Sequence, residues 1–184
     1  MGSTMKSKRT LAWIVLVGGV AVLASYAYVV SLDAATQRAL WGNVPETLLP
    51  AYVTSMLLAA TGYLVFTGYL LFRVEPDRAR IAGRVGYSLL HVLYLMILIP
   101  SALWLPLTAA MVQQPSGLLW LLIRLVLGLV ALGSAGVLLA LLAWRPRKPG
   151  VFFWLAVAGS LAFCFQTAIL DLFVWTAFFP ARGI

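Results

Sequence analysis

Long apolar stretches constrain this chain more than any other feature of its sequence. A helix crosses a bilayer core of about 30 Å with about 20 apolar residues. Five stretches meet that requirement, at about 11–31, 48–72, 85–110, 118–144 and 151–179. Only 10% of the residues are charged, whereas soluble domains carry about 25%. We therefore predict an all-α integral membrane protein in which residues 1–184 form a single membrane domain, a bundle of five transmembrane helices.

The basic residues are unevenly divided among the segments that connect these helices. Ten lie in the N-terminal tail and the second and fourth connections, against two in the first connection and the C-terminal tail. Because Lys and Arg accumulate on the cytoplasmic side, we expect a cytoplasmic N-terminus and an extracytoplasmic C-terminus. The first stretch is too long for a typical signal peptide and is expected to remain. The plasma membrane or an inner membrane is the expected location.

The net charge of +8 belongs mostly to those connections. Anionic lipid headgroups are its expected counterpart, so membrane lipids are predicted partners and nucleic acid is not. The single cysteine, Cys164, cannot form a disulfide within the chain.

Two charged residues lie inside predicted spans, Arg124 in the fourth and Asp171 in the fifth. Each shares one helical face with small or weakly polar residues: Gly128, Ala131 and Ala135 in one span, and Thr167, Cys164 and Ser160 in the other. A close-packed antiparallel hairpin that matches these stripes places Arg124 opposite Asp171. A charge in a bilayer costs at least about 2.5–3.5 kcal/mol, so we predict an intramembrane ion pair. It either pins the helices or lines a polar site; unpaired snorkelling is the remaining alternative.

Other polar side chains fall deep in the predicted spans. Tyr63 and Tyr94 each need a hydrogen-bond partner there. His91 lies one turn before Tyr94 and is the only histidine, so no metal or haem site is expected. It is either a hydrogen-bonded structural residue or part of a proton relay or ligand contact.

The tryptophans and the first connection have an interfacial pattern. The seven tryptophans fall near helix ends, which is typical of a belt at the membrane surface. Residues 32–41 are expected to form a short helix on that surface, capped by Ser31 and anchored by Trp41. Pro50 suits the first turn of the next helix.

No catalytic motif, phosphate-binding loop or cysteine pair is present. We expect a non-enzymatic protein without cofactor or catalytic residues, which binds or conveys a small lipid-like or amphipathic ligand. The alternative is an accessory or assembly subunit of a larger membrane complex, or a homo-oligomer, without its own ligand. The candidate ligand-binding residues are Arg124, Asp171, Tyr26, Tyr28 and Ser55 in the outer half, and Tyr63, His91 and Tyr94 in the inner half.

Overall fold

The computed structural model describes residues 2–76, 80–81, 85–145 and 149–180, which are almost entirely helical. The five spans are long and apolar enough to cross a membrane, as predicted. They comprise α1 (Gly2–Val30), α3 (Leu49–Phe72), α4 (Ser88–Gln113), α5 (Gly117–Ala143) and a composite last span. The last span runs through α6 (Val151–Cys164), the π-helix η2 (Phe165–Trp175) and α7 (Thr176–Phe178).

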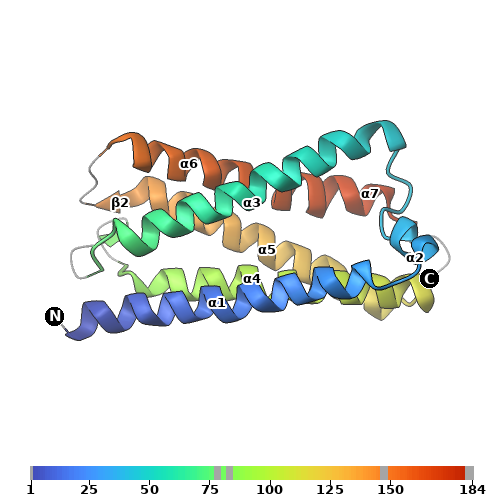
Figure 1. Ribbon diagram of the computed structural model, residues 1–184, viewed down its shortest axis with the longest axis horizontal. Coiled ribbons are helices and arrows are strands. Elements are labelled where there is room, and N and C mark those ends of the chain that lie inside the picture. The colour runs from blue at the N-terminus through green and yellow to red at the C-terminus, as the bar shows by residue number, and fades with distance from the viewer. Residues whose placement is uncertain (1, 77–79, 82–84, 146–148, 181–184) are drawn as a thin grey trace.

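The two ends of the bundle differ in their connections (Figure 1). The first end holds the N-terminus and two short antiparallel strands, β1 (Arg80–Ile81) and β2 (Trp144–Arg145), and we call it the strand end. The opposite end holds α2 (Ala34–Ala39), and we call it the α2 end. The strand pairing joins the second and fourth connections, which no sequence pattern had indicated.

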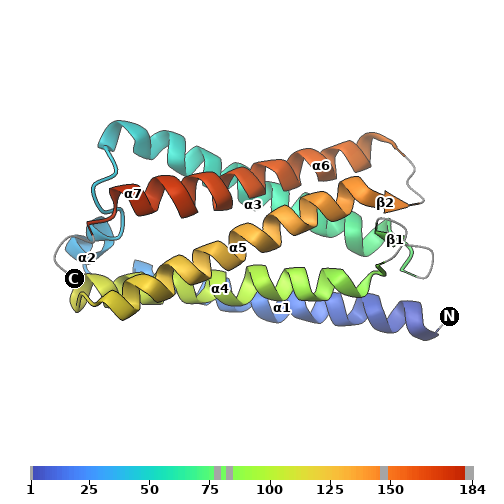
Figure 2. The same ribbon diagram turned by 180° about the vertical axis from the view of Figure 1, so that it is seen from behind.

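Helices that are distant in the sequence form the main contacts of the bundle. Helix α1 packs along α4, α4 along α5, and α3 along α6. Seen from either side, α3 lies near the other helices at the strand end and runs away from α1 toward the α2 end (Figures 1 and 2). Pro100 and Pro106 lie inside α4, which continues through both.

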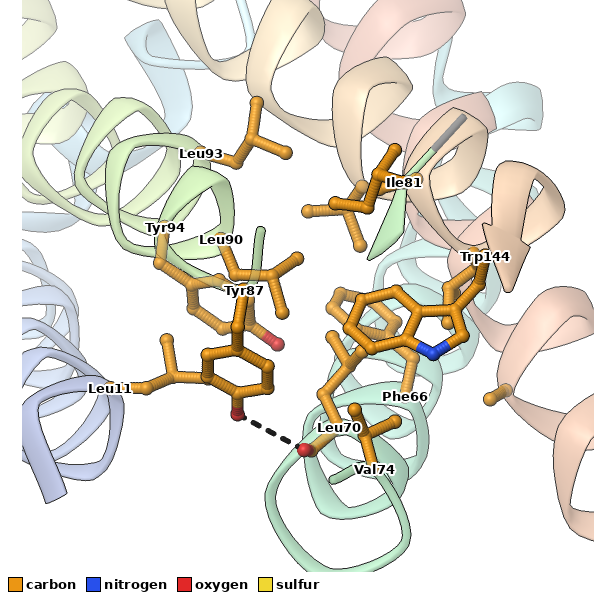
Figure 3. Packing of buried hydrophobic residues seen from close by; sticks show 14 of the residues in the cluster. Leu11, Phe66, Leu70, Val74, Ile81, Tyr87, Leu90, Leu93, Tyr94 and Trp144 are labelled. Atoms are coloured by element: carbon orange, nitrogen blue, oxygen red, sulfur yellow. Dashed lines mark hydrogen bonds between the residues drawn. The ribbon is translucent and has the colours of Figure 1, made fainter. Parts of the chain in front are cut away.

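An aromatic and aliphatic core fills the strand end. Phe66, Tyr87, Tyr94 and Trp144 are buried there among leucines from several helices. The Tyr87 hydroxyl donates a hydrogen bond of 3.1 Å to the carbonyl oxygen of Leu70, which joins α4 to α3 (Figure 3). This packing satisfies a buried hydroxyl within an apolar region.

A close backbone contact joins α3 to α6. A Cβ atom on Gly62 would lie 2.3 Å from the carbonyl oxygen of Gly159, so neither backbone leaves room for a side chain. A Cβ on Gly128 would meet no atom within 4 Å. Gly128 therefore does not provide the close approach between α5 and the last span that was predicted at its position.

A second core fills the α2 end, where the first connection packs against the last span. Trp175 is 2% exposed, and its indole nitrogen donates to the carbonyl oxygen of Leu40 across 3.0 Å. The backbone amide of Asn43 donates to the carbonyl oxygen of Phe178 at 2.9 Å. Trp144 at the strand end is also buried, so these two tryptophans pack inside the protein.

Helix α2 forms as predicted, although its cap differs. Asp33 is the N-cap residue, and its carboxylate accepts hydrogen bonds from the backbone amide and the hydroxyl of Thr36 at 2.9 and 2.6 Å. Ser31 instead donates to the carbonyl oxygen of Tyr28. A carboxylate is the stronger acceptor, and the hydrogen bonds from Thr36 lower the pKa of Asp33. Pro50 lies in the first turn of α3, as expected.

Candidate functional site

The last span contains the most unusual backbone of the molecule. Its helix changes from α to π geometry at Phe165 and returns to α geometry after Trp175, an interval of 11 residues. Most π-helical segments are single turns inside α-helices, and they are frequent at functional sites. The long η2 segment is therefore a candidate functional site.

The π geometry brings Gln166 and Asp171 together. In an α-helix, two residues five positions apart point about 140° away from each other. In a π-helix, hydrogen bonds join residues i and i+5, so the two side chains lie on the same side. The Gln166 amide nitrogen donates to a carboxylate oxygen of Asp171 across 2.8 Å. A regular α-helix would give these two residues separate contacts, and the sequence carries no sign of the π segment.

The surroundings of this pair are mostly apolar, with two tyrosines nearby. Gln166 is 4% exposed and Asp171 is half-buried. The Tyr52 hydroxyl donates to the backbone carbonyl of Leu170. The Tyr26 and Tyr52 hydroxyls both lie within electrostatic range of the Asp171 carboxylate. We call Gln166, Asp171, Tyr52 and Tyr26 the η2 site.

Arg124 does not belong to this site, and the predicted ion pair was wrong. Among the described residues, the salt bridge is the one between Arg38 and Glu46, at 2.5 Å. Arg124 is exposed on α5, and Asp171 accepts its hydrogen bond from Gln166. The exposed position of Arg124 fits the snorkelling alternative.

A shift in helix register explains the missing ion pair. The Thr167 hydroxyl lies 2.8 Å from the hydroxyl of Ser134, so these two residues mark equal depth on η2 and α5. The predicted hairpin had placed Thr167 opposite Gly128, six residues earlier on α5. Six residues correspond to about 9 Å along an α-helix. Arg124 is displaced from Asp171 along the bundle by a similar distance, and the two side chains form no ion pair.

The other outer candidates lie apart from the Gln166–Asp171 pair. The Tyr28 side chain is exposed on α1, and Ser55 is half-buried on α3. Within the described ranges, neither hydroxyl has a hydrogen bond to Gln166 or Asp171. Tyr26 is thus the outer candidate that the structure brings into electrostatic range of Asp171.

The three inner candidates lie in the packed strand end. The Tyr94 hydroxyl is 2.7 Å from the Thr67 hydroxyl, and the Tyr94 side chain is fully buried. The ring of Tyr63 packs against that of Tyr94, with centroids 6.0 Å apart, but the buried Tyr63 hydroxyl lacks, among the described residues, the partner predicted for it. His91 Nε2 lies 3.0 Å from the carbonyl oxygen of Ser7, which ties α4 to α1. These contacts are typical of structural polar residues in a helix bundle.

Two members of the η2 site were missed as candidates. Tyr52 carries no sequence signal beyond its place near the start of a span. Gln166 was visible as an amide within the apolar sequence "LAFCFQTAIL", which needs a hydrogen-bond partner wherever it is buried.

Comparison with known proteins identifies no relative for this chain. No protein-family model matches it, and neither a curated protein nor a solved structure is significantly similar. Among the described residues, no group of three or more His, Cys, Asp or Glu side chains is arranged to hold a metal ion. The η2 site must therefore be interpreted from its own chemistry.

Proposed function

We propose that this protein is a non-enzymatic membrane protein that binds or conveys a small amphipathic ligand at the η2 site. The observation that carries the proposal is the Gln166–Asp171 pair, a carboxylate and an amide held together by an uncommon helix geometry inside an apolar span. Ionisable residues inside spans are expensive to place and typically serve function.

The packing around the η2 site supports entry of the ligand from the side of the bundle that faces lipid. The first connection packs against the last span at the α2 end, through Leu40 and Trp175 and through Asn43 and Phe178. Asp171 itself keeps partial exposure, and Tyr26 is 39% exposed on α1. An amphipathic molecule in the membrane would reach the carboxylate beside α1, with its polar head inward and its tail among lipid chains.

The orientation of the protein is part of the proposal. The described basic residues of the N-terminal tail and of the second and fourth connections share the strand end, whereas Arg38 lies at the α2 end. The positive-inside tendency then places the strand end in the cytoplasm. The η2 site would lie in the outer half of the bilayer. The natural Cys164 can be replaced so that single cysteines at each end report the topology by labelling in intact cells.

Native mass spectrometry of protein extracted gently from its own membrane tests the proposed function. We expect a discrete adduct of one small molecule on the wild-type chain. Asp171→Asn should remove the adduct, whereas Arg124→Ala should retain it, because Arg124 lies outside the site. An adduct that survives in Asp171→Asn, or a wild-type chain without any adduct, would refute the proposal.

A second candidate function, as a subunit of a larger membrane complex, is favoured by α1. Only 6% of its apolar span is buried, and Trp13, Leu16 and Val20 are exposed on it. Such a surface suits either lipid or a partner helix. Polypeptides that co-purify in fixed stoichiometry in the same measurement would support the subunit and identify its partners.

A further inference from the structure

The η2 site holds a buried hydrogen-bond acceptor that no donor in the described part of the chain satisfies. A carboxylate accepts hydrogen bonds only, so the Gln166 amide must turn its NH₂ group toward Asp171. This orientation leaves Gln166 Oε1 as a buried acceptor, and it has no hydrogen-bond partner in the described part of the chain. Buried polar atoms of this kind normally have a partner. Gln166 Oε1, on the side chain that donates to the Asp171 carboxylate, is therefore an acceptor without a donor.

Within the described ranges, no basic side chain forms an ion pair with the Asp171 carboxylate. Arg38 is paired with Glu46, and Arg124 is exposed and displaced along α5. The Tyr52 hydroxyl already donates its hydrogen to Leu170. A carboxylate in an apolar environment is strongly destabilised unless a cation or a proton accompanies it. A single group that carries both N–H donors and positive charge would supply the hydrogen bonds and the charge together.

We infer that the η2 site binds a primary ammonium head group of an amphipathic molecule. This inference rests on the proposed function and specifies its ligand. An ammonium is a compact cation with three donors, which match the two acceptor groups of Asp171 and Gln166. A quaternary ammonium has the charge but no N–H donor, an alcohol has a donor but no charge, and a carboxylate is repelled. The same chemistry occurs in ethanolamine phospholipids and in free long-chain amines.

The test compares probes that differ only in the head group. The full-length protein is placed in nanodiscs of phosphatidylcholine, with or without phosphatidylethanolamine. Native mass spectrometry then identifies the retained lipid by its mass. Dodecylamine, dodecyltrimethylammonium, dodecanol and laurate are titrated in parallel into phosphatidylcholine nanodiscs. A preference for phosphatidylethanolamine identifies a lipid, whereas a preference limited to dodecylamine identifies a free amphiphilic amine. Either preference supports the inference.

We expect the primary ammonium probe to bind at least about tenfold more tightly than its trimethylated counterpart, as a charge-assisted hydrogen bond would provide. Asp171→Asn and Gln166→Met should each abolish this preference. Asp33→Asn, which removes an exposed carboxylate outside the spans, should retain it. The wild-type probe series alone decides the head group if either site variant fails to fold.

The two hypotheses fail in different ways. Equal binding of the trimethylammonium probe, or tighter binding of dodecanol or laurate, with loss in Asp171→Asn, would overturn the head-group assignment and leave the proposed function standing. If no probe and no native molecule binds in a saturable, Asp171-dependent manner, both are overturned.

Discussion

Gly62 and Gly159 touch through their backbones where α3 crosses α6. Gly62→Ala should destabilise the fold by about 1–3 kcal/mol, because an added Cβ must displace backbone atoms. Gly68→Ala on the same helix is the matched control, since its Cβ meets no atom within 4 Å. Equilibrium unfolding in mixed micelles measures both changes. Equal effects at the two positions would contradict this contact.

Because Arg124 and Asp171 form no ion pair, substitutions at the two positions should change the stability independently. Asp171→Asn should leave stability unchanged or raise it by about 1–3 kcal/mol, because it removes an uncompensated carboxylate from an apolar site. Arg124→Leu should change stability by less than about 0.5 kcal/mol, as is usual for an exposed side chain. If the two side chains formed a buried ion pair, removing either partner would instead lower the stability by about 3–5 kcal/mol. Thermal unfolding of both variants in detergent distinguishes the two arrangements.

The hydroxyls of Thr67 and Tyr94 should couple α3 to α4. A double-mutant cycle with Thr67→Val and Tyr94→Phe is expected to give a coupling energy of about 0.6 kcal/mol, with about 1.7 as an upper range for such bonds in membrane proteins. Thr61→Val replaces Thr67→Val in the control cycle, since its hydroxyl bonds to Leu57 on its own helix. Additive effects in the first cycle would show that the hydroxyl contact contributes nothing.

The stability of α2 should depend on pH through its N-cap residue, Asp33. Hydrogen bonds from the hydroxyl and backbone amide of Thr36 lower the pKa of Asp33 below its ordinary value of about 3.9. A lowered pKa in the folded state contributes stability above the unfolded pKa, and this contribution disappears as the pH falls through the folded pKa. Amide exchange in α2 should be constant, once corrected for intrinsic rates, from neutral pH to about pH 5 and accelerate below the ordinary carboxyl range.

Two variants sharpen this measurement. Asp33→Asn keeps a capping side chain but cannot titrate, so its exchange should show no such acceleration. Thr36→Val removes the hydroxyl donor and brings the folded pKa of Asp33 closer to its unfolded value, so the acceleration should be smaller and level off at a higher pH than in the wild type. An identical profile in all three proteins would mean that Asp33 does not control the fraying of α2.

The spans were predictable from sequence because hydrophobic length alone decides them. The partner of each helix was not, since the pairing of α3 with α6 depends on Gly62 and Gly159, which look like other helical glycines in the sequence. The candidate site was half predictable. Asp171 stands out as a charge in an apolar run. Its hydrogen-bond partner, Gln166, lies beside it only because the helix has π geometry there.

The change from α to π geometry accounts for the main prediction errors in the last span. With α geometry throughout, Gln166 points away from Asp171, and Thr167 was placed opposite Gly128. The π-helix brings Gln166 and Asp171 together, and the contact of Thr167 with Ser134 gives the register that separates Arg124 from Asp171. Propensity and periodicity contain no signal for such a segment, because its residues are ordinary helix residues.

The pairing of α3 with α6 also has a consequence for biosynthesis. The chain between Phe72 and Val151 comprises 78 residues, from 73 to 150. At a synthesis rate of about 5–20 residues per second, α3 waits roughly 4–16 s before α6 begins to emerge. During that interval its glycine face has no native neighbour, and a chaperone or lipid must occupy it. Nascent chains arrested before residue 151 should therefore present Gly62 to crosslinking partners that the finished protein excludes.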